Sequence, residues 1–198
     1  MKKWTILAPL GLAAGAAALV LLKRKSAPKA APAAGAPAAK KTPPANPKTG
    51  SYSFISGFQN AATVEMTLDY DADKFSFAVV EEDFLSASSD SHVALVRGED
   101  FSLQLEYASY YTGEDFAAHC ASLAEKHRDF GPVRYGSVDA VKYLEGDTLC
   151  FCIPIPQDEH SYVQVFLFKA KDNDTPLEQM AEDPELSALL SGIRFSRS

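Results

Sequence analysis

The sequence predicts an α+β fold, in which helices pack on an antiparallel β-sheet, preceded by a single transmembrane helix and a disordered linker. Three observations lead to this prediction. Residues 4–22 carry no charge, and residues 26–50 are rich in Ala, Pro and Lys and contain no acidic or aromatic residue. From residue 51 onward, apolar and polar residues alternate in short runs, which is typical of half-buried strands. We therefore divide the chain into a membrane anchor at residues 1–25, a flexible linker at 26–50 and a globular domain at 51–198.

The apolar run at residues 4–22 is long enough to cross a bilayer. As a helix it spans roughly 28 Å, about the thickness of the hydrocarbon core. A cleaved secretory signal ends in small residues directly after its apolar run, but Lys23, Arg24 and Lys25 follow the run here. We therefore expect an uncleaved signal-anchor that holds the protein in the lipid bilayer by a single pass.

The side of the membrane follows from the charges that flank the span. Lys and Arg residues near a span mark its cytoplasmic end. Four of them lie between residues 23 and 29, whereas Lys2 and Lys3 precede the span. This excess favours a domain on the cytoplasmic face. The excess is small, so the extracytoplasmic side stays open as the alternative.

Small residues recur at a four-residue spacing within the span. Gly11 and Gly15 form a Gly-x-x-x-Gly pair, and Ala14 and Ala18 repeat the spacing. Such residues allow two helix backbones to approach closely in lipid. The spacing favours a homodimer through the span, although any segment rich in Ala and Gly contains such pairs by chance.

Charge divides the chain sharply. Residues 1–50 carry nine Lys and Arg residues and no acidic residue, whereas residues 51–198 carry ten Lys and Arg residues and 26 Asp and Glu residues, a net charge of −16. Phosphate backbones repel a body this acidic, so nucleic-acid binding is disfavoured. A cationic protein partner would suit it, and solubility is the alternative explanation of the charge.

Two hairpins are predicted at the start of the domain. Residues 64–70 and 75–79 alternate in polarity on either side of a short turn at residues 71–73, so we expect them to pair with each other. Residues 93–97 and 101–107 do the same across Gly98-Glu99-Asp100. The second hairpin would turn Phe101, Leu103, Leu105 and Tyr107 toward the core.

The period then changes to that of a helix. Thr112 and Asp115 approximate a capping box, and Phe116, Cys120 and Leu123 fall on one helical stripe. We expect this helix to end at Gly131-Pro132.

Further strands and helices are predicted after it. The expected strands are 138–144, 148–155, 162–169 and 193–195, and the expected helices are one after residue 175 and one at 184–191. Pro154 should leave the end of its strand at an edge or bulge. Pro184 suits the first turn of the last helix, and Gly192 its end.

This order of elements resembles the PsbP-like (Mog/PsbP) family, which includes photosystem II extrinsic subunits and many small bacterial exported or lipid-anchored proteins. The residues that carry the resemblance are the aromatic strand 75–79, the strand 101–107 with residues 112–116 after it, and the ending 189–195. They lie within residues 62–196. The resemblance implies an α/β/α sandwich and a non-enzymatic accessory or binding module. It offers no shared catalytic residues.

The three cysteines are the main candidates for chemistry. Cys150 and Cys152 lie two apart in a predicted strand, so both thiols face one side, and Cys120 lies on the helical stripe. With a histidine they could form a redox or metal site. A single Cys-x-Cys lacks the paired Cys-x-x-Cys of zinc sites, and a free Cys usually behaves as a small buried hydrophobe. We therefore predict no catalytic residue, no metal and no cofactor.

These observations together predict a membrane-tethered, non-catalytic binding or accessory module that presents an acidic domain on a flexible stalk. Tyr107, Tyr110 and Tyr111 are the predicted partner-contact patch, because Tyr is enriched at interfaces; the alternative is that Tyr107 belongs to the core. Two other functions stay open. One is a thiol-dependent enzyme or redox protein that uses Cys120 or the Cys150/Cys152 pair, and the other is a self-associating membrane scaffold.

Overall fold

The computed structural model describes residues 44–56, 62–82, 91–109, 115–156, 158 and 161–197. The predicted anchor, with Gly11, Gly15 and Ala18, and most of the predicted linker lie outside these ranges. Within them, no helix combines the length and the apolar composition that a bilayer crossing requires.

Ten strands and three short helices make up the described part of the chain. The strands are β1 (Pro47–Ser56), β2 (Ala62–Asp71), β3 (Ser76–Glu82), β4 (Ser91–Arg97), β5 (Phe101–Ser109), β6 (Arg128–Tyr135), β7 (Val138–Glu145), β8 (Thr148–Pro154), β9 (Ser161–Lys169) and β10 (Ile193–Arg197); the helices are α1 (Phe116–Lys126), α2 (Leu177–Met180) and α3 (Pro184–Ser191).

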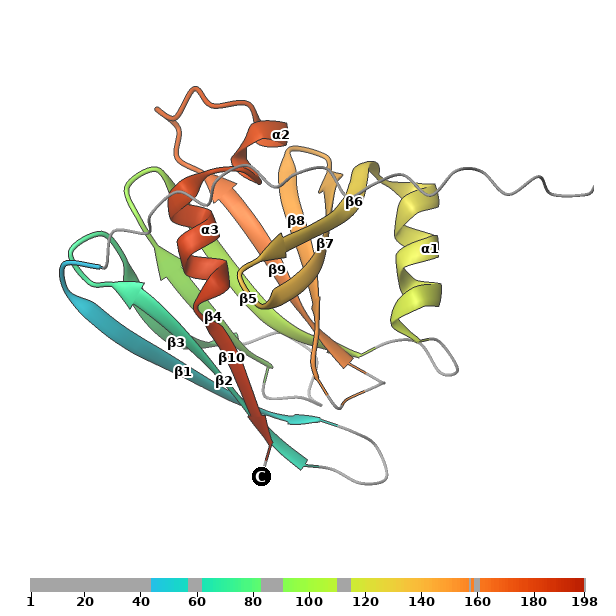
Figure 1. Cartoon of the computed structure of the whole chain (residues 1–198), viewed down its shortest axis with the longest axis horizontal. Helices are drawn as coiled ribbons and strands as arrows, with labels where there is room; N and C mark the ends of the chain where they lie inside the picture. The colour runs from blue at the N-terminus through green and yellow to red at the C-terminus, as the bar shows by residue number, and fades with distance from the viewer. Residues whose placement is uncertain are drawn as a thin grey trace, which may run out of the picture. The chain divides into compact units, whose positions relative to one another are not determined.

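The strands form two antiparallel sheets (Figure 1). One has three strands in the order β1-β2-β10, and the other has seven in the order β3-β4-β5-β9-β8-β7-β6. The predicted α+β class, with helices on a single sheet in an α/β/α sandwich, is therefore wrong: the described fold is mostly β. Its physical reason is that a second sheet, together with α3, covers the face of the seven-stranded sheet that helices alone were expected to cover.

The first predicted hairpin is also wrong. Both of its strands exist, but β2 pairs with β1 and β10, whereas β3 pairs with β4. Between them the backbone N–H groups of Lys74 and Phe75 both donate to the carbonyl oxygen of Asp71, which bends the chain from one sheet into the other. Alternating polarity determines which face of a strand is buried, and it leaves the partner strand undetermined.

The globular domain begins earlier than predicted. Strand β1 starts at Pro47, inside the range 26–50 assigned to the linker. Gly50 lies directly against the ring of Phe77, so closely that a Cβ at residue 50 would overlap that ring. Small polar residues alternate along β1 with Tyr52 and Phe54, and only the two aromatic side chains reach the core.

The helix after β5 is shorter than predicted at both ends: a capping box with Thr112 at its N-cap would start the helix near residue 113, whereas α1 begins at Phe116. Asp115 caps α1, because its carboxylate accepts a hydrogen bond from the backbone N–H of Ala118 over 2.8 Å. The helix ends at Lys126, and Gly131-Pro132 lie within β6 rather than at the helix end. Proline is tolerated there because β6 is an edge strand, which has an unpaired side for a residue without an N–H.

The later elements follow the predictions closely. The β4–β5 hairpin and strands β7, β8, β9 and β10 are confirmed. Pro154 ends β8 at a point where β7 no longer pairs with it. Helix α3 is capped by the Asp183 side chain, has Pro184 in its first turn and ends at Gly192.

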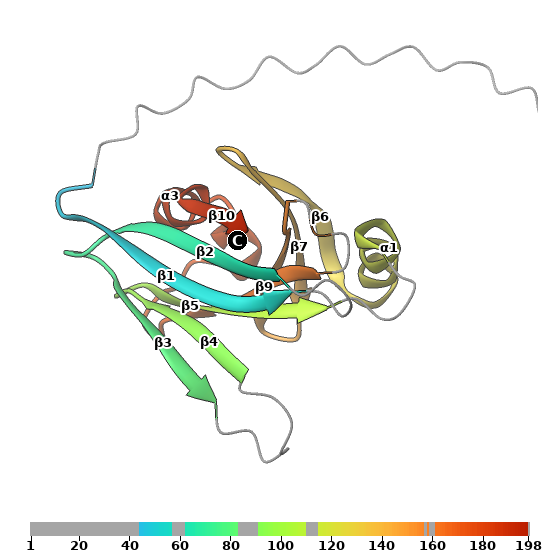
Figure 2. The ribbon, with the colours of Figure 1, turned by 90° about the horizontal axis from the view of Figure 1, so that it is seen from below.

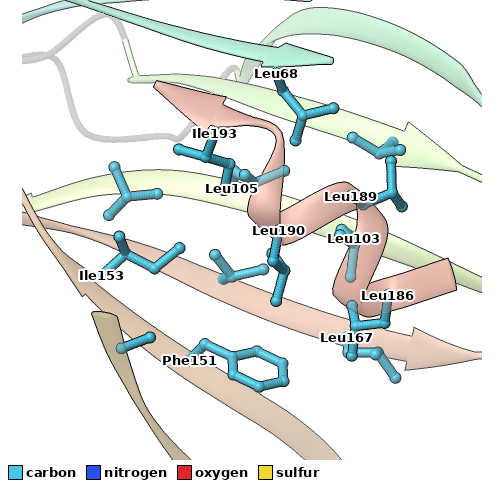
Figure 3. Packing of buried hydrophobic residues seen from close by; sticks show 14 of the residues in the cluster. Leu68, Leu103, Leu105, Phe151, Ile153, Leu167, Leu186, Leu189, Leu190 and Ile193 are labelled. Carbon is cyan, nitrogen blue, oxygen red and sulfur yellow. The ribbon is translucent and has the colours of Figure 1, made fainter. Parts of the chain in front are cut away.

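The main core lies between the two sheets and beneath α3. Leu186, Leu189 and Leu190 of α3 point toward β5, β8 and β9 (Figure 3). A second, smaller cluster lies on the opposite face of the seven-stranded sheet, where α1 packs on β6 and β7. Figure 2 shows α1 at one end of that sheet and the β3–β4 pair at the other end. The β3–β4 pair diverges there from β1 and β2.

Candidate functional site

The predicted tyrosine patch is only partly described. Tyr110 and Tyr111 lie outside the described residues. Tyr107 packs against the main core, where its ring stacks on that of Phe54 with centroids 4.5 Å apart. Its hydroxyl lies 2.8 Å from the hydroxyl of Ser161, which is fully buried. These contacts match the alternative in which Tyr107 is a core residue.

The three cysteines meet in the small cluster under α1. Cys150 and Cys152 both face α1, as the predicted strand alternation requires, and both are fully buried. Cys120 is half-buried on the helix and packs against the same cluster. The structure therefore brings the predicted thiols together on one face of the sheet.

Three polar side chains join this cluster. Gln164 on β9 lies beside Cys152 on β8, and the thiol donates to Oε1 of Gln164 over 3.1 Å. The hydroxyl of Tyr143 donates to the same oxygen over 3.3 Å. Nε2 of His119, on α1, lies 3.8 Å from the Cys152 sulfur. We call His119, Tyr143, Cys152 and Gln164 the Gln164 cluster.

One sequence signal could have identified Gln164. It is a polar residue between Val163 and Val165 in a strand whose two faces are both buried, and its exposed fraction is only 6%. No comparable signal exists for His119, because it approaches Cys152 from a helix 33 residues away.

The environment of the thiols disfavours their ionised form. Burial raises the pKa of Cys152, and the nearby Cys120 and Cys150 add to the effect. Burial, followed by the charge of Glu145, raises the pKa of Cys150 to about 12. Burial and Asp115 also raise the pKa of Cys120. The thiolate is the nucleophile and the metal ligand, so all three cysteines are weakly reactive at neutral pH.

The face of the seven-stranded sheet that carries the Gln164 cluster continues past α1 to β3. Val80 and Phe168 are exposed on this part of the face, whereas Val93, which pairs with Val80 and Glu106, is buried. Cross-strand pairing places five of its residues on one surface, which we call the open face: Val80, Leu95, Gln104, Glu106 and Phe168. Phe168 is 47% exposed and Val80 is 39% exposed. Gln104 donates a hydrogen bond to Glu106. The open face thus combines exposed apolar side chains with a carboxylate.

Among the residues that the structure describes, no three His, Cys, Asp or Glu side chains are grouped so that they could hold a metal ion. No family model, no curated protein and no solved structure matches this chain.

Proposed function

We propose that this protein is a membrane-tethered, non-catalytic binding module that presents an acidic domain on a flexible stalk and contacts a cationic protein partner. The open face carries this proposal. Large exposed apolar side chains such as Phe168 and Val80 are typical of the centre of a protein contact. Residues 51–198 carry a net charge of −16, which attracts cationic surfaces and increases their rate of association.

A thiol-dependent enzyme is the second candidate, because Cys152 has both a histidine and a buried amide beside it. Nε2 of His119 lies 3.8 Å from the sulfur, and Gln164 contacts it at 3.1 Å. Nucleophilic cysteines have such neighbours, but they are partly exposed and have lowered pKa values. Cys152 is fully buried and its pKa is raised, so the geometry favours a structural cysteine.

Photocrosslinking tests the binding module. The photoreactive amino acid p-benzoylphenylalanine replaces Phe168 in the full chain, and the same replacement at Ile55 is the control. Ile55 is 69% exposed on β1, in the other sheet. After irradiation of intact cells, we expect a covalent adduct with a second, Lys- and Arg-rich protein from position 168 and none from position 55. We also expect the chain to remain in the membrane fraction after a carbonate wash.

Three results would overturn the proposal. Equal adducts from both positions would mean non-specific contact, and no adduct from position 168 would mean that the open face binds no protein partner. Release of the intact chain by carbonate would contradict the membrane tether.

A further inference from the structure

Strand β3 is an edge of the seven-stranded sheet, and among the described strands it pairs only with β4. An edge strand leaves every second backbone N–H and C=O unpaired by its own sheet. These unpaired groups can form hydrogen bonds with a strand of another chain.

The register identifies the residues of β3 whose backbone groups face outward. The backbone N–H of Gly98 donates to the carbonyl oxygen of Phe101, so the backbone N–H and C=O groups of Gly98 face β5. By alternation, those of Val96 also face β5. The backbone groups of the alternate residues Arg97 and Leu95 therefore face β3. On β3, Ser76 pairs with Arg97, Ala78 with Leu95 and Val80 with Val93, so the backbone groups of Ser76, Ala78 and Val80 face β4. The backbone groups of Phe77 and Val79 consequently face away from the sheet.

The outer half of β3 is exposed on both faces. Phe77 still packs on the core, against Gly50 and beside the ring of Tyr70. Beyond it, Ala78, Val79 and Val80 are all exposed, and Val79 and Val80, on opposite faces, have exposed fractions of 43% and 39%. Three consecutive exposed apolar residues on an edge strand form a docking surface for an extended segment, which would cover both faces at once.

Charge selects the occupant. Glu81 and Glu82 follow the exposed residues directly in the sequence, and residues 51–198 carry a net charge of −16. A second copy of this domain would be repelled, whereas a segment with Lys or Arg beside its apolar residues would be attracted.

We propose that the edge of β3 binds an extended, cationic segment of a partner protein, which adds an eighth strand to the seven-stranded sheet beside β3. This inference rests on the proposed function, since it names the chemistry of the partner and one place where the partner binds. Backbone hydrogen bonds to Phe77 and Val79 supply affinity, and the negative net charge of residues 51–198 favours lysine-containing segments.

Three labelled peptides serve as probes of the full chain. The first is acetyl-Lys-Thr-Val-Lys-Val-Thr-Lys-amide, the second has Glu in place of each Lys, and the third is the first with alternate backbone nitrogens methylated on its pairing edge. Fluorescence anisotropy measures binding. We expect the lysine peptide to bind and the glutamate peptide to bind at least tenfold more weakly. The methylated peptide should lose binding, because its pairing edge has no N–H groups to donate.

Variants of β3 locate the binding edge. Val79→Pro removes an outward-facing N–H without removing a hydrogen bond to β4, and proline is tolerated at such edge positions. It should abolish binding of the lysine peptide, while the matched control Val79→Thr, which keeps the N–H, should reduce binding less than threefold. Val80→Lys leaves the backbone unchanged and repels the peptide, so it should weaken binding even if Val79→Pro does not fold. Near-ultraviolet circular dichroism checks the fold of each variant.

The outcomes separate this inference from the proposed function. Unchanged binding to folded Val79→Pro, unchanged binding to Val80→Lys, equal binding of the glutamate peptide, or a dimer of the full chain that Val79→Pro dissociates would each overturn the edge proposal. Absence of peptide binding together with an adduct from position 168 would reject the edge and leave the binding module standing. Absence of both would reject both.

Discussion

The thiol of Cys152 donates to the side-chain oxygen of Gln164 over 3.1 Å in a fully buried site between α1 and the sheet. The other atom of the same amide, Nε2 of Gln164, is buried and has no hydrogen-bond partner in the described part of the chain. Exchanging the amide oxygen and nitrogen would leave the other atom unpaired, so one polar atom stays unsatisfied in either orientation. In either orientation the amide contacts the Cys152 sulfur and so positions it.

Thiol labelling follows from this environment. We expect Cys150 and Cys152 of the folded full chain to react with an aromatic disulfide reagent at neutral pH at least about a hundredfold more slowly than in denaturant, because reaction requires local opening. Half-buried Cys120 should react first of the three, and still slowly. The measurement is release of the aromatic thiol, with Cys120→Ala as the control. Rapid modification of Cys152 would support the thiol-dependent enzyme instead.

Gly192 should tolerate no side chain. A Cβ at this position would lie 2.7 Å from the backbone carbonyl oxygen of Asp69 on β2, which cannot move aside as a flexible side chain could. We expect Gly192→Ala to lower the free energy of unfolding by about 1–3 kcal/mol. Gly131→Ala is the matched control, because nothing lies within 4 Å of its Cβ; it should change stability by less than about 0.5 kcal/mol. Equal losses in the free energy of unfolding for the two variants, measured by denaturant titration, would show that the close approach of Asp69 does not exclude a side chain at residue 192.

Tyr107→Phe should affect stability and leave partner binding unchanged. The change removes the hydroxyl that lies 2.8 Å from the buried hydroxyl of Ser161 and keeps the stacking on Phe54. We expect a loss of about 1–3 kcal/mol in the free energy of unfolding, the cost of an unsatisfied buried polar group. The yield of adduct from position 168 should stay the same. A lower yield of adduct without a loss of stability would support the prediction that Tyr107 contacts the partner.

Stability should fall in acid through Asp71. Hydrogen bonds from the backbone N–H groups of Ala45, Asp73 and Asn46, together with the charge of Lys74, hold the pKa of Asp71 below its ordinary value. A lowered folded-state pKa contributes stability that is present above the ordinary pKa and is lost as pH falls through the folded-state value. The loss should therefore begin below about pH 4.

The variant Asp71→Asn should flatten this part of the pH profile, measured as the thermal midpoint from pH 6 to pH 2. Asp139→Asn is the control, because Asp139 is exposed and its ion pair with Arg134 is 3.4 Å long at the surface. An unchanged acid slope in Asp71→Asn would contradict the role of Asp71 in holding the start of β1.

The sequence alone predicts the elements whose signals are local. Alternation identifies β2, β3 and the β4–β5 hairpin, because the side-chain period of a strand is visible over a few residues. Pro184 marks the start of α3 through a backbone angle that depends only on neighbours in the chain. The acidic character of the domain is likewise a property of composition.

Two strands escaped prediction because they contain proline, which their position at a sheet edge tolerates. Both β1 and β6 are outermost in their sheets, where one side of the backbone has no strand to pair with. Pro47 and Pro132 are therefore tolerated in strands, although in a sequence they indicate a linker or a turn. These two strands, with the separation of β2 from β3, turn an expected helix-covered sheet into two packed sheets.

Composition, local period and caps thus determined where most strands and helices of this protein lie and how acidic it is. Only the tertiary structure decided which strands pair, that His119 and Gln164 approach Cys152, and that Val79 and Val80 remain exposed. The physical reason is that strand pairing and burial depend on contacts between residues far apart in the chain, and the alternation of a single strand carries no information about its partner.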